Sequence, residues 1–306
     1  MSSQISADNS EYTQYSPVAP VWDFSTAPDG DTISTVQEGY SLAAAGSMPR
    51  AEFKDAVRLC HQGDRHFKKR EYEKAEKDYV ASLALLNTMP FPTETGWVTL
   101  RIGRAASRRR DHQRAAEFAT TAVSIFEDVG DNRGLAAAHR LLGQMIYRAH
   151  DYRKALTHFK KSLDYLYGLD CDGEQGMVMN LIGKTSYRRG DYSAAIDSFL
   201  NAINKFEASD DIQGQLQALE NLARAYFSSG LISEAYSTTL QRLRLCRRQR
   251  DLIELAWSCL SAARLSAALG SQGDFSRYIH EAEELFRSQG DADGLVECMN
   301  VRTSAA

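Results

Sequence analysis

Residues 93–306 contain no proline. The six prolines of the chain are Pro17, Pro20, Pro28, Pro49, Pro90 and Pro92. Proline interrupts a helix because its ring removes a hydrogen-bond donor and clashes with the preceding turn. A long proline-free segment with apolar residues at 3–4 spacing is typical of an all-α protein.

The chain also lacks long apolar runs and the common catalytic signatures. No apolar stretch approaches the roughly 18 residues that a membrane span needs. Phosphate-binding loops, G-x-G-x-x-G, H-E-x-x-H and G-x-S-x-G are absent. The seven histidines show no paired metal-ligand spacing: His61, His66, His112, His139, His150, His158 and His280. We therefore expect no enzyme activity, no cofactor and no bound metal.

Cysteine is scarce, and its number is odd. The five cysteines are Cys60, Cys171, Cys246, Cys259 and Cys298, and no C-x-x-C occurs. This usage predicts reduced, buried packing residues rather than a disulfide framework. The first residues have neither the charge pattern of a signal peptide nor the arginines of a transit peptide. We expect a cytoplasmic protein.

Basic residues are missing from residues 1–49, which hold six acids: Asp8, Glu11, Asp23, Asp29, Asp31 and Glu38. The rest carries 36 basic and 34 acidic residues, a net +2, because all 36 Lys and Arg and 34 of the 40 acids lie there. Residues 1–49 are predicted to be a disordered acidic tail. Within it, Val21–Phe24 is either a short docking motif or an apolar island with no role.

A 40-residue period organises the remainder, residues 50–306. Small residues recur at Gly63, Gly103, Gly143, Gly183, Ala223 and Ala263. Alanines follow twelve residues later at Ala75, Ala115, Ala155, Ala195 and Ala235. Aspartates keep the same spacing at Asp131, Asp211, Asp251 and Asp291. A fixed period of this length predicts a solenoid, in which each unit buries its apolar face against its neighbours.

One period contains two helices joined by a short turn. Gly130-Asp131 ends one helix and begins the next, helix A. His150-Asp151 forms the turn to helix B. We expect Gly143 and Ala155 to lie where the two helices cross most closely, because a large side chain there would push the hairpin apart.

The unit from Ile182-Gly183 through Tyr187, Gly190-Asp191-Tyr192 and Ala195 to Phe199 resembles a tetratricopeptide repeat. The resemblance implies a right-handed α-solenoid of about six helical hairpins, with residues 291–306 as a capping helix. The 40-residue unit and its D-x-x-G linkers are similar to the longer repeats of the LGN and rapsyn scaffolds. Pro90 and Pro92 make the first linker irregular. Gly273-Asp274-Phe275 predicts a turn three residues longer than the others after Ala263.

In tetratricopeptide arrays helix A lines the concave face, and here its outward positions are largely basic. We predict a partner-binding groove formed by Arg104, Arg108, Arg140, Gln144, Tyr147, Arg148, Asn180, Lys184, Tyr187, Arg188, Arg224 and Arg264. Guanidinium groups bind carboxylates with two hydrogen bonds, so the predicted partner is an extended acidic peptide segment. The alternative is that the cations only oppose helix dipoles.

Two further arginine clusters, Arg101–Arg114 and Arg242–Arg250, leave phosphate on RNA or lipid as another possible ligand, although a net +2 is low for that class. The leading interpretation is a noncatalytic scaffold or adaptor, which the resemblance places in cortical, cytoskeletal or receptor assemblies. A second hypothesis is an autoinhibited module whose acidic tail occupies the groove until it is displaced, with phosphorylation tuning that contact.

Overall fold

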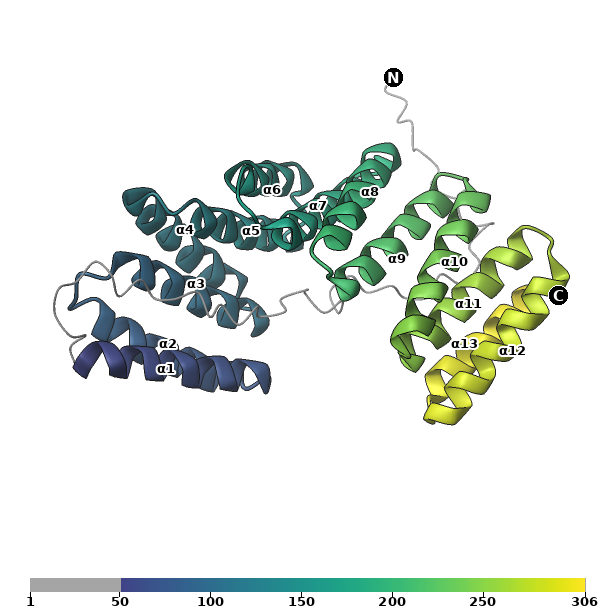
Figure 1. Cartoon of the computed structure of the whole chain (residues 1–306), viewed down its shortest axis with the longest axis horizontal. Helices are drawn as coiled ribbons and strands as arrows, with labels where there is room; N and C mark the ends of the chain where they lie inside the picture. The colour runs from purple at the N-terminus through teal and green to yellow at the C-terminus, as the bar shows by residue number, and fades with distance from the viewer. Residues whose placement is uncertain (1–50, 306) are drawn as a thin grey trace, which may run out of the picture. The chain divides into compact units, whose positions relative to one another are not determined.

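A computed structural model describes residues 51–305. These residues form thirteen helices and no strand (Figure 1). The helices are α1 (Ala51–Lys68), α2 (Tyr72–Leu86), α3 (Pro92–Arg108), α4 (His112–Val129), α5 (Asn132–Arg148), α6 (Tyr152–Leu166), α7 (Asp172–Arg188), α8 (Tyr192–Ala208), α9 (Ile212–Ser228), α10 (Ile232–Gln249), α11 (Leu252–Ala268), α12 (Gln272–Gln289) and α13 (Ala292–Ala305). The predicted all-α class of tandem helical hairpins is confirmed. Odd-numbered helices are the A helices and even-numbered helices the B helices. The predicted tail, residues 1–49, lies outside the described residues.

The described helices fall into two compact units, α1–α9 up to Ser229 and α10–α13 from Gly230 onward. In the first unit each helix packs against the next, and the A helices α3 and α7 also contact the A helices α5 and α9. In the second unit α10 packs on α11, α11 on α12, and α13 on both α12 and α11. This order gives the first unit one layer of A helices and one of B helices.

The turns keep the 40-residue period. Asp131 accepts a hydrogen bond from the N–H of Gly134 at 2.9 Å, and Asp191 accepts one from Ala194 at 3.2 Å, so both aspartates cap helices as predicted. Between A and B helices one residue always has a positive φ. Those residues are Arg70, Arg110, His150, Gly190, Gly230 and Gly270. Half of these positions hold a residue with a side chain, so the turn conformation is kept even where no glycine eases it.

Glycines of the A helices make room for aromatic rings of the B helices. A Cβ on Gly143 would lie 2.5 Å from the ring of Phe159, and one on Gly183 would lie 2.6 Å from the ring of Phe199. A Cβ on Gly63 would also lie 3.1 Å from the carbonyl oxygen of Ala75. The close crossing predicted for these small residues is confirmed, and the rings explain why glycine is needed.

Two kinds of repeat alternate along the chain, so equivalent side-chain contacts recur every 80 residues rather than every 40. Phe126, Phe206 and Phe286 are buried near the ends of α4, α8 and α12. A Cβ added to the glycine eight residues later would collide with each ring; these glycines are Gly134, Gly214 and Gly294. In the other repeats Leu86, Leu166 and Cys246 fill the same buried position. The D-x-x-G linkers therefore accompany a phenylalanine and recur at every second repeat.

A buried serine marks the repeats that lack this phenylalanine. The hydroxyl of Ser82 donates to the carbonyl oxygen of Ala56 at 2.7 Å, and the hydroxyl of Ser162 donates to that of Ala136 at 2.7 Å. The phenylalanine repeats have buried alanine at this place, and α10 has Arg242. Each serine ties a B helix to the preceding A helix at a position where its hydroxyl is satisfied.

The predicted longer turn after Ala263 is wrong. α11 ends at Ala268 and α12 begins at Gln272, the same spacing as between α7 and α8. Gly270 has φ 71°, as Gly190 has φ 78°. Phe275 fills the buried position that Ala195 fills in α8, so the usual alanine is missing from the motif.

α13 is the last described helix of the second unit. Its predicted role as a capping helix stays a prediction; a cap has a polar outer side. Val296 and Met299 are 49% and 57% exposed.

The glycine–aromatic contact predicts a large difference between two substitutions in α7. Gly183→Ala is expected to lower the free energy of unfolding by about 1–3 kcal/mol, because its Cβ overlaps the ring of Phe199. Gly173→Ala meets only Ser209 at 3.4 Å and is expected to leave stability unchanged or slightly raised. Urea unfolding of both variants measures the difference. Equal effects would show that the ring contact does not set the hairpin spacing.

Candidate functional site

Three A helices of the first unit bring predicted groove residues together around Tyr147, near the end of α5. Burial raises the pKa of Tyr147, and the positive charges of Arg188 and Arg224 oppose that rise. Arg188 lies at the end of α7 and Arg224 lies in α9. Two arginines that lie 41 and 77 residues further along the sequence, one and two repeats onward, therefore act on one phenol.

Two pairs of tyrosines hold the aromatic positions of this surface. The ring centroids of Tyr147 and Tyr152 lie 5.3 Å apart, and those of Tyr187 and Tyr192 lie 5.4 Å apart. The hydroxyl of Tyr187 is also 2.9 Å from the hydroxyl of Ser228, at the end of α9. The aromatic groups are thus fixed between the basic positions rather than left to rotate.

The basic surface continues to α3. The guanidinium groups of Arg104 and Arg108 lie 5.8 and 6.0 Å from the ring centroid of Phe67 in α1, within cation–π distance. Burial lowers the pKa of His112, at the start of α4, and the positive charge of Arg148 lowers it further. Arg148, at the end of α5, therefore lies close to the turn that follows α3. We call the predicted groove residues of α3, α5, α7 and α9 the A-helix surface.

Two of the predicted groove residues are buried, so their prediction as outward groups is wrong. Asn180 is 3% exposed, donates to Gln217 at 2.9 Å and accepts from Asn221 at 3.0 Å. These amides join α7 to α9, which pack against each other. Lys184 lies one turn further along the same flank of α7 and is 9% exposed. The close packing of successive A helices covers this flank.

The remaining predicted positions divide between the two units. Arg140 and Gln144 are half-buried on α5. Arg224 is 2.9 Å from Glu220, four residues earlier on α9. Arg264 belongs to the second unit, where it is 2.6 Å from Glu297 of α13. The A-helix surface is therefore built within the first unit, and Arg264 holds the last two A helices of the second unit together.

The first arginine cluster, Arg101–Arg114, is largely structural. Arg101 is 3.2 Å from Asp64, which also accepts the hydroxyl of Tyr79 at 2.8 Å. Arg109 and Arg114 lie 2.6 and 2.8 Å from Glu76, whose side chain is 6% exposed. Both guanidinium groups offset the cost of burying this carboxylate. Together they tie α2 to the helices that follow it.

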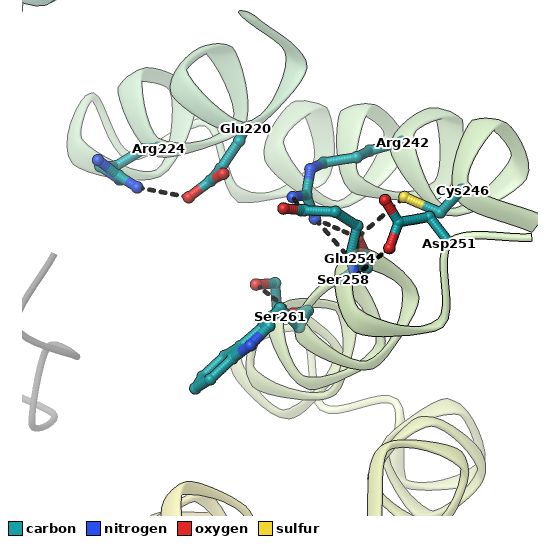
Figure 2. A network of polar contacts seen from close by, with 9 residues as sticks. Glu220, Arg224, Arg242, Cys246, Asp251, Glu254, Ser258 and Ser261 are labelled. Carbon is teal, nitrogen blue, oxygen red and sulfur yellow. Dashed lines mark hydrogen bonds and ion pairs between the residues drawn. The ribbon is translucent and has the colours of Figure 1, made fainter. Parts of the chain in front are cut away.

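The second cluster begins with a buried arginine (Figure 2). Arg242 of α10 donates to the carboxylate of Glu254 and to the hydroxyl of Ser258, both on α11. The Ser258 hydroxyl is also 3.7 Å from the thiol of Cys246, and Asp251 caps α11 by accepting from the N–H of Glu254 at 3.1 Å. This network replaces the serine-to-carbonyl contact found in α2 and α6. The sequence left phosphate open as a ligand of this cluster, but the guanidinium group of Arg242 is bound to Glu254 and Ser258 inside the protein.

Replacing Arg242 tests its structural role. Arg242→Ala is expected to lower the free energy of unfolding by about 2 kcal/mol, a value reduced because Glu254 is partly exposed. Arg244→Ala removes an exposed arginine of the same cluster and is expected to change stability by less than about 0.5 kcal/mol. Thermal unfolding of the two variants compares them. Equal stability would contradict the assignment of Arg242 to packing.

Sequence reasoning missed a histidine pair, in which His139 is buried and His158 is half-buried. The Nδ1 atoms of His139 on α5 and His158 on α6 lie 3.2 Å apart, and Tyr165 stacks on His139 with centroids 5.7 Å apart. The hairpin brings the two together although their spacing of 19 residues matches no ligand motif. Residues 51–305 hold no group of three or more His, Cys, Asp or Glu side chains arranged for a metal ion.

The four buried cysteines are inert. Burial raises the pKa of Cys60 to about 11 and that of Cys259 to about 12. Cys246 and Cys298 are buried as well, and none of the five cysteines is in a disulfide. A protonated thiol is a poor nucleophile, so these side chains serve packing, as predicted.

Burial of His139 predicts acid sensitivity. Burial lowers the pKa of His139 to about 4, and the charges of His158 and Lys161 add to that shift. A lowered folded-state pKa means that the unfolded chain binds the proton first. Stability therefore falls as the pH drops from about 6.5 towards 4, by at most about 1.4 kcal/mol per pH unit for this group.

His139→Leu places at this position the residue that α1 and α9 carry there, Leu59 and Leu219. The variant is expected to lose less stability between pH 7 and pH 5 than the unaltered protein does. Urea unfolding at both pH values gives the two differences. Parallel losses in the two proteins would show that other groups cause the acid sensitivity.

Comparisons with known proteins agree with this architecture. The tetratricopeptide repeat family model matches residues 94–167, which run from the first turn of α3 to just past the end of α6. Residues 94–167 thus match the tetratricopeptide repeat, and the other hairpins have the same order of two helices joined by a short turn. The Tonsoku-like protein of Bos taurus is 29% identical over 152 residues. That match covers 47% of this chain and 10% of the relative, so the chain spans a small part of that protein.

Several solved structures share the fold. A signal transduction ATPase with a tetratricopeptide repeat sensor from Pyrococcus horikoshii is similar over 82% of this chain and 42% of its own, with TM-score 0.67 and 12% identity. A Rap protein complexed with competence and sporulation factor is similar over 82% of this chain and 76% of its own, with TM-score 0.59 and 17% identity. BtubC from P. vanneervenii is similar over 65% of this chain and 88% of its own, with TM-score 0.57 and 18% identity. These likenesses, at 12–18% identity, show the fold alone. No described helix combines the length and hydropathy required to cross a membrane.

Proposed function

We propose that this protein is a noncatalytic scaffold that holds an acidic segment of a partner protein against the A-helix surface of the first unit. The observation that carries the proposal is the convergence of Arg188 and Arg224 on Tyr147 from successive A helices. A guanidinium group beside a phenol offers both charge and stacking to an acidic chain.

The arrangement suits an extended ligand rather than a small molecule. Basic positions recur in α3, α5, α7 and α9 and aromatic positions in α5, α7 and α9, so one ligand chain meets similar groups at successive helices. Neighbouring packed helices lie roughly 8–10 Å apart, which is about three residues of an extended chain. Glu220 beside Arg224 places one acid on the surface, so the proposed segment carries a basic or neutral residue there.

Two named structural neighbours support the class of function. A Rap protein was solved in complex with competence and sporulation factor, and Cut9 was solved in a hetero-tetramer with Hcn1. We extend this to a cytoplasmic adaptor of cortical or cytoskeletal assemblies, in line with the LGN and rapsyn resemblance. RNA and phosphate are less well supported, because Arg109, Arg114 and Arg242 are engaged with carboxylates.

The test is quantitative affinity purification with mass spectrometry, using an Arg148→Glu/Arg188→Glu variant of the full chain. Lys184 is left in place because it is buried, and a glutamate there would destabilise α7. Recovery of the specific partners is expected to fall at least tenfold, since two attractive charges become repulsive. Circular dichroism checks that the variant remains helical.

The matched control is Arg153→Glu/Lys160→Glu, which makes the same change of charge at exposed positions of α6. It is expected to keep the partners. Equal recovery in both variants would refute the A-helix surface as the binding site. Deleting residues 1–49 in the same assay separates the second candidate, in which the acidic tail competes for this surface: autoinhibition requires recovery to rise, and unchanged recovery excludes it. The charge asymmetry between the tail and the rest motivates that candidate.

A further inference from the structure

The turn between α10 and α11 leads into two exposed aliphatic side chains. Leu252 is 50% exposed and Ile253 is 60% exposed, and they are the first two residues of α11. The Cα–Cβ bonds of a helix tilt towards its start, so the side chains of a first turn project off the end of the helix. The two side chains therefore protrude at this turn. We call Leu252 and Ile253 the α11 tip.

The packing of the repeats does not require two aliphatic residues at these positions. In α5 and α7 the equivalent residues form ion pairs: Arg133 lies 2.8 Å from Glu174, and Asp172 lies 2.7 Å from Lys205. Each of the other A helices from α3 onward has at least one polar residue in the pair, namely Pro92-Thr93, Asn132-Arg133, Asp172-Gly173, Ile212-Gln213 and Ala292-Asp293. The apolar surface of the α11 tip is therefore particular to this helix.

Three exposed arginines precede the α11 tip. Arg244 and Arg248 lie four residues apart on one face of α10, and Arg250 follows in the turn with φ 56°. Within residues 51–305 none of the three forms an ion pair, whereas Arg242 and Arg247 pair with glutamates of α11 and α12. Their guanidinium groups are available to a ligand.

The end of α12 adds a fourth exposed arginine at the same end of the second unit. The side-chain amide of Gln289 donates to the carbonyl oxygen of Leu252 at 3.1 Å, so the last turn of α12 lies against the start of α11. Arg287 is exposed in that last turn. The cations thus come from two helices that meet at the α11 tip.

The acids of the turn are engaged within the protein. Asp251 accepts the N–H of Glu254 at 3.1 Å, and the carboxylate of Glu254 is bound by the buried Arg242. Asp293 is exposed in the first turn of α13. Four exposed guanidinium groups therefore stand against one exposed carboxylate, so this end of the unit attracts anions.

We propose that the α11 tip binds the surface of a lipid bilayer that carries anionic headgroups. Leu252 and Ile253 enter the boundary between headgroups and acyl chains, and the arginines lie at the level of the lipid phosphates. Guanidinium groups bind phosphate with two parallel hydrogen bonds, and aliphatic side chains gain free energy on leaving water. Two small insertions hold a protein weakly, so the contact is peripheral and reversible and depends on anionic lipid.

The chemistry of the tip favours a bilayer over other polyanions. Proteins that bind single-stranded nucleic acid stack its bases on aromatic rings, and residues 244–253 include no aromatic residue. An acidic peptide would satisfy the arginines but would leave protruding aliphatic side chains largely in water. A bilayer surface meets both groups at once, because its phosphates lie directly above its apolar interior.

The test is co-sedimentation of the full chain with vesicles of phosphatidylcholine that contain about 30% phosphatidylserine, and with vesicles of phosphatidylcholine alone. Binding is expected only to the anionic vesicles, and it is expected to fall as the salt concentration rises. Leu252→Ser/Ile253→Ser removes the inserted groups, and Arg244→Gln/Arg248→Gln removes two charges. Each double variant is expected to bind the anionic vesicles more weakly by roughly tenfold or more.

Matched controls make the same changes away from the tip. Val80→Ser/Leu200→Ser replaces aliphatic side chains that are 43% and 41% exposed on α2 and α8. Arg153→Gln/Lys160→Gln removes two exposed charges of α6. Both control variants are expected to bind the vesicles as the unaltered protein does. Circular dichroism checks that all four variants remain helical.

Absence of binding to the anionic vesicles would overturn the proposal, and so would equal binding by the tip variants and the controls. Binding that needs the arginines but not Leu252 and Ile253 would show that nothing inserts, which also overturns it. A short single-stranded RNA is the competing probe: RNA binding through the same arginines without vesicle binding would assign the surface to nucleic acid. The tip variants leave the A-helix surface unchanged, so the result is independent of the function proposed for that surface.

Discussion

The close approach of an A-helix glycine to an aromatic ring of the following B helix is the contact on which the hairpins depend. At Gly143 and Gly183 there is no room for a Cβ, so the ring sets the distance between the two helices. A second ring, such as Phe126 against Gly134, sets the distance to the next A helix in alternate repeats. Dispersion contacts of this kind are individually weak, but they are lost together when the spacing changes. Successive A helices are close because both spacings are short.

That closeness determines which polar residues can serve a partner. α7 and α9 pack tightly enough to bury Asn180 in a chain of amides, and the flank of α7 that carries it is closed to ligands. Elsewhere on these helices, Arg188 of α7 and Arg224 of α9 act on the phenol of Tyr147 of α5. The same packing thus removes Asn180 and Lys184 from the predicted groove and leaves Arg140, Gln144 and Arg224 half-buried. A partner would meet the C-terminal halves of the A helices.

The sequence predicted what repetition determines locally and missed what depends on the neighbour across a hairpin. Capping by Asp131 and the need for a small residue at Gly143 follow from short-range rules, and both were found. The prediction of a longer turn after Ala263 was wrong because Phe275 occupies the buried position that alanine fills in the other B helices, so the usual motif was not recognised. Lysine is usually exposed, so the burial of Lys184 could not be predicted from its residue type. The binding role of the other groove residues stays a prediction.

Arginine has two roles in this array, and its surroundings decide between them. Arg242 shows how a large polar residue is accepted inside a hairpin when an acid and a hydroxyl across the interface satisfy it. Arg109 and Arg114 do the same for the buried carboxylate of Glu76. Guanidinium groups held in this way stabilise the packing of the helices and have little left to offer a ligand. The arginines of the A-helix surface are the ones proposed to bind a partner protein, and binding through charge pairs there depends strongly on salt.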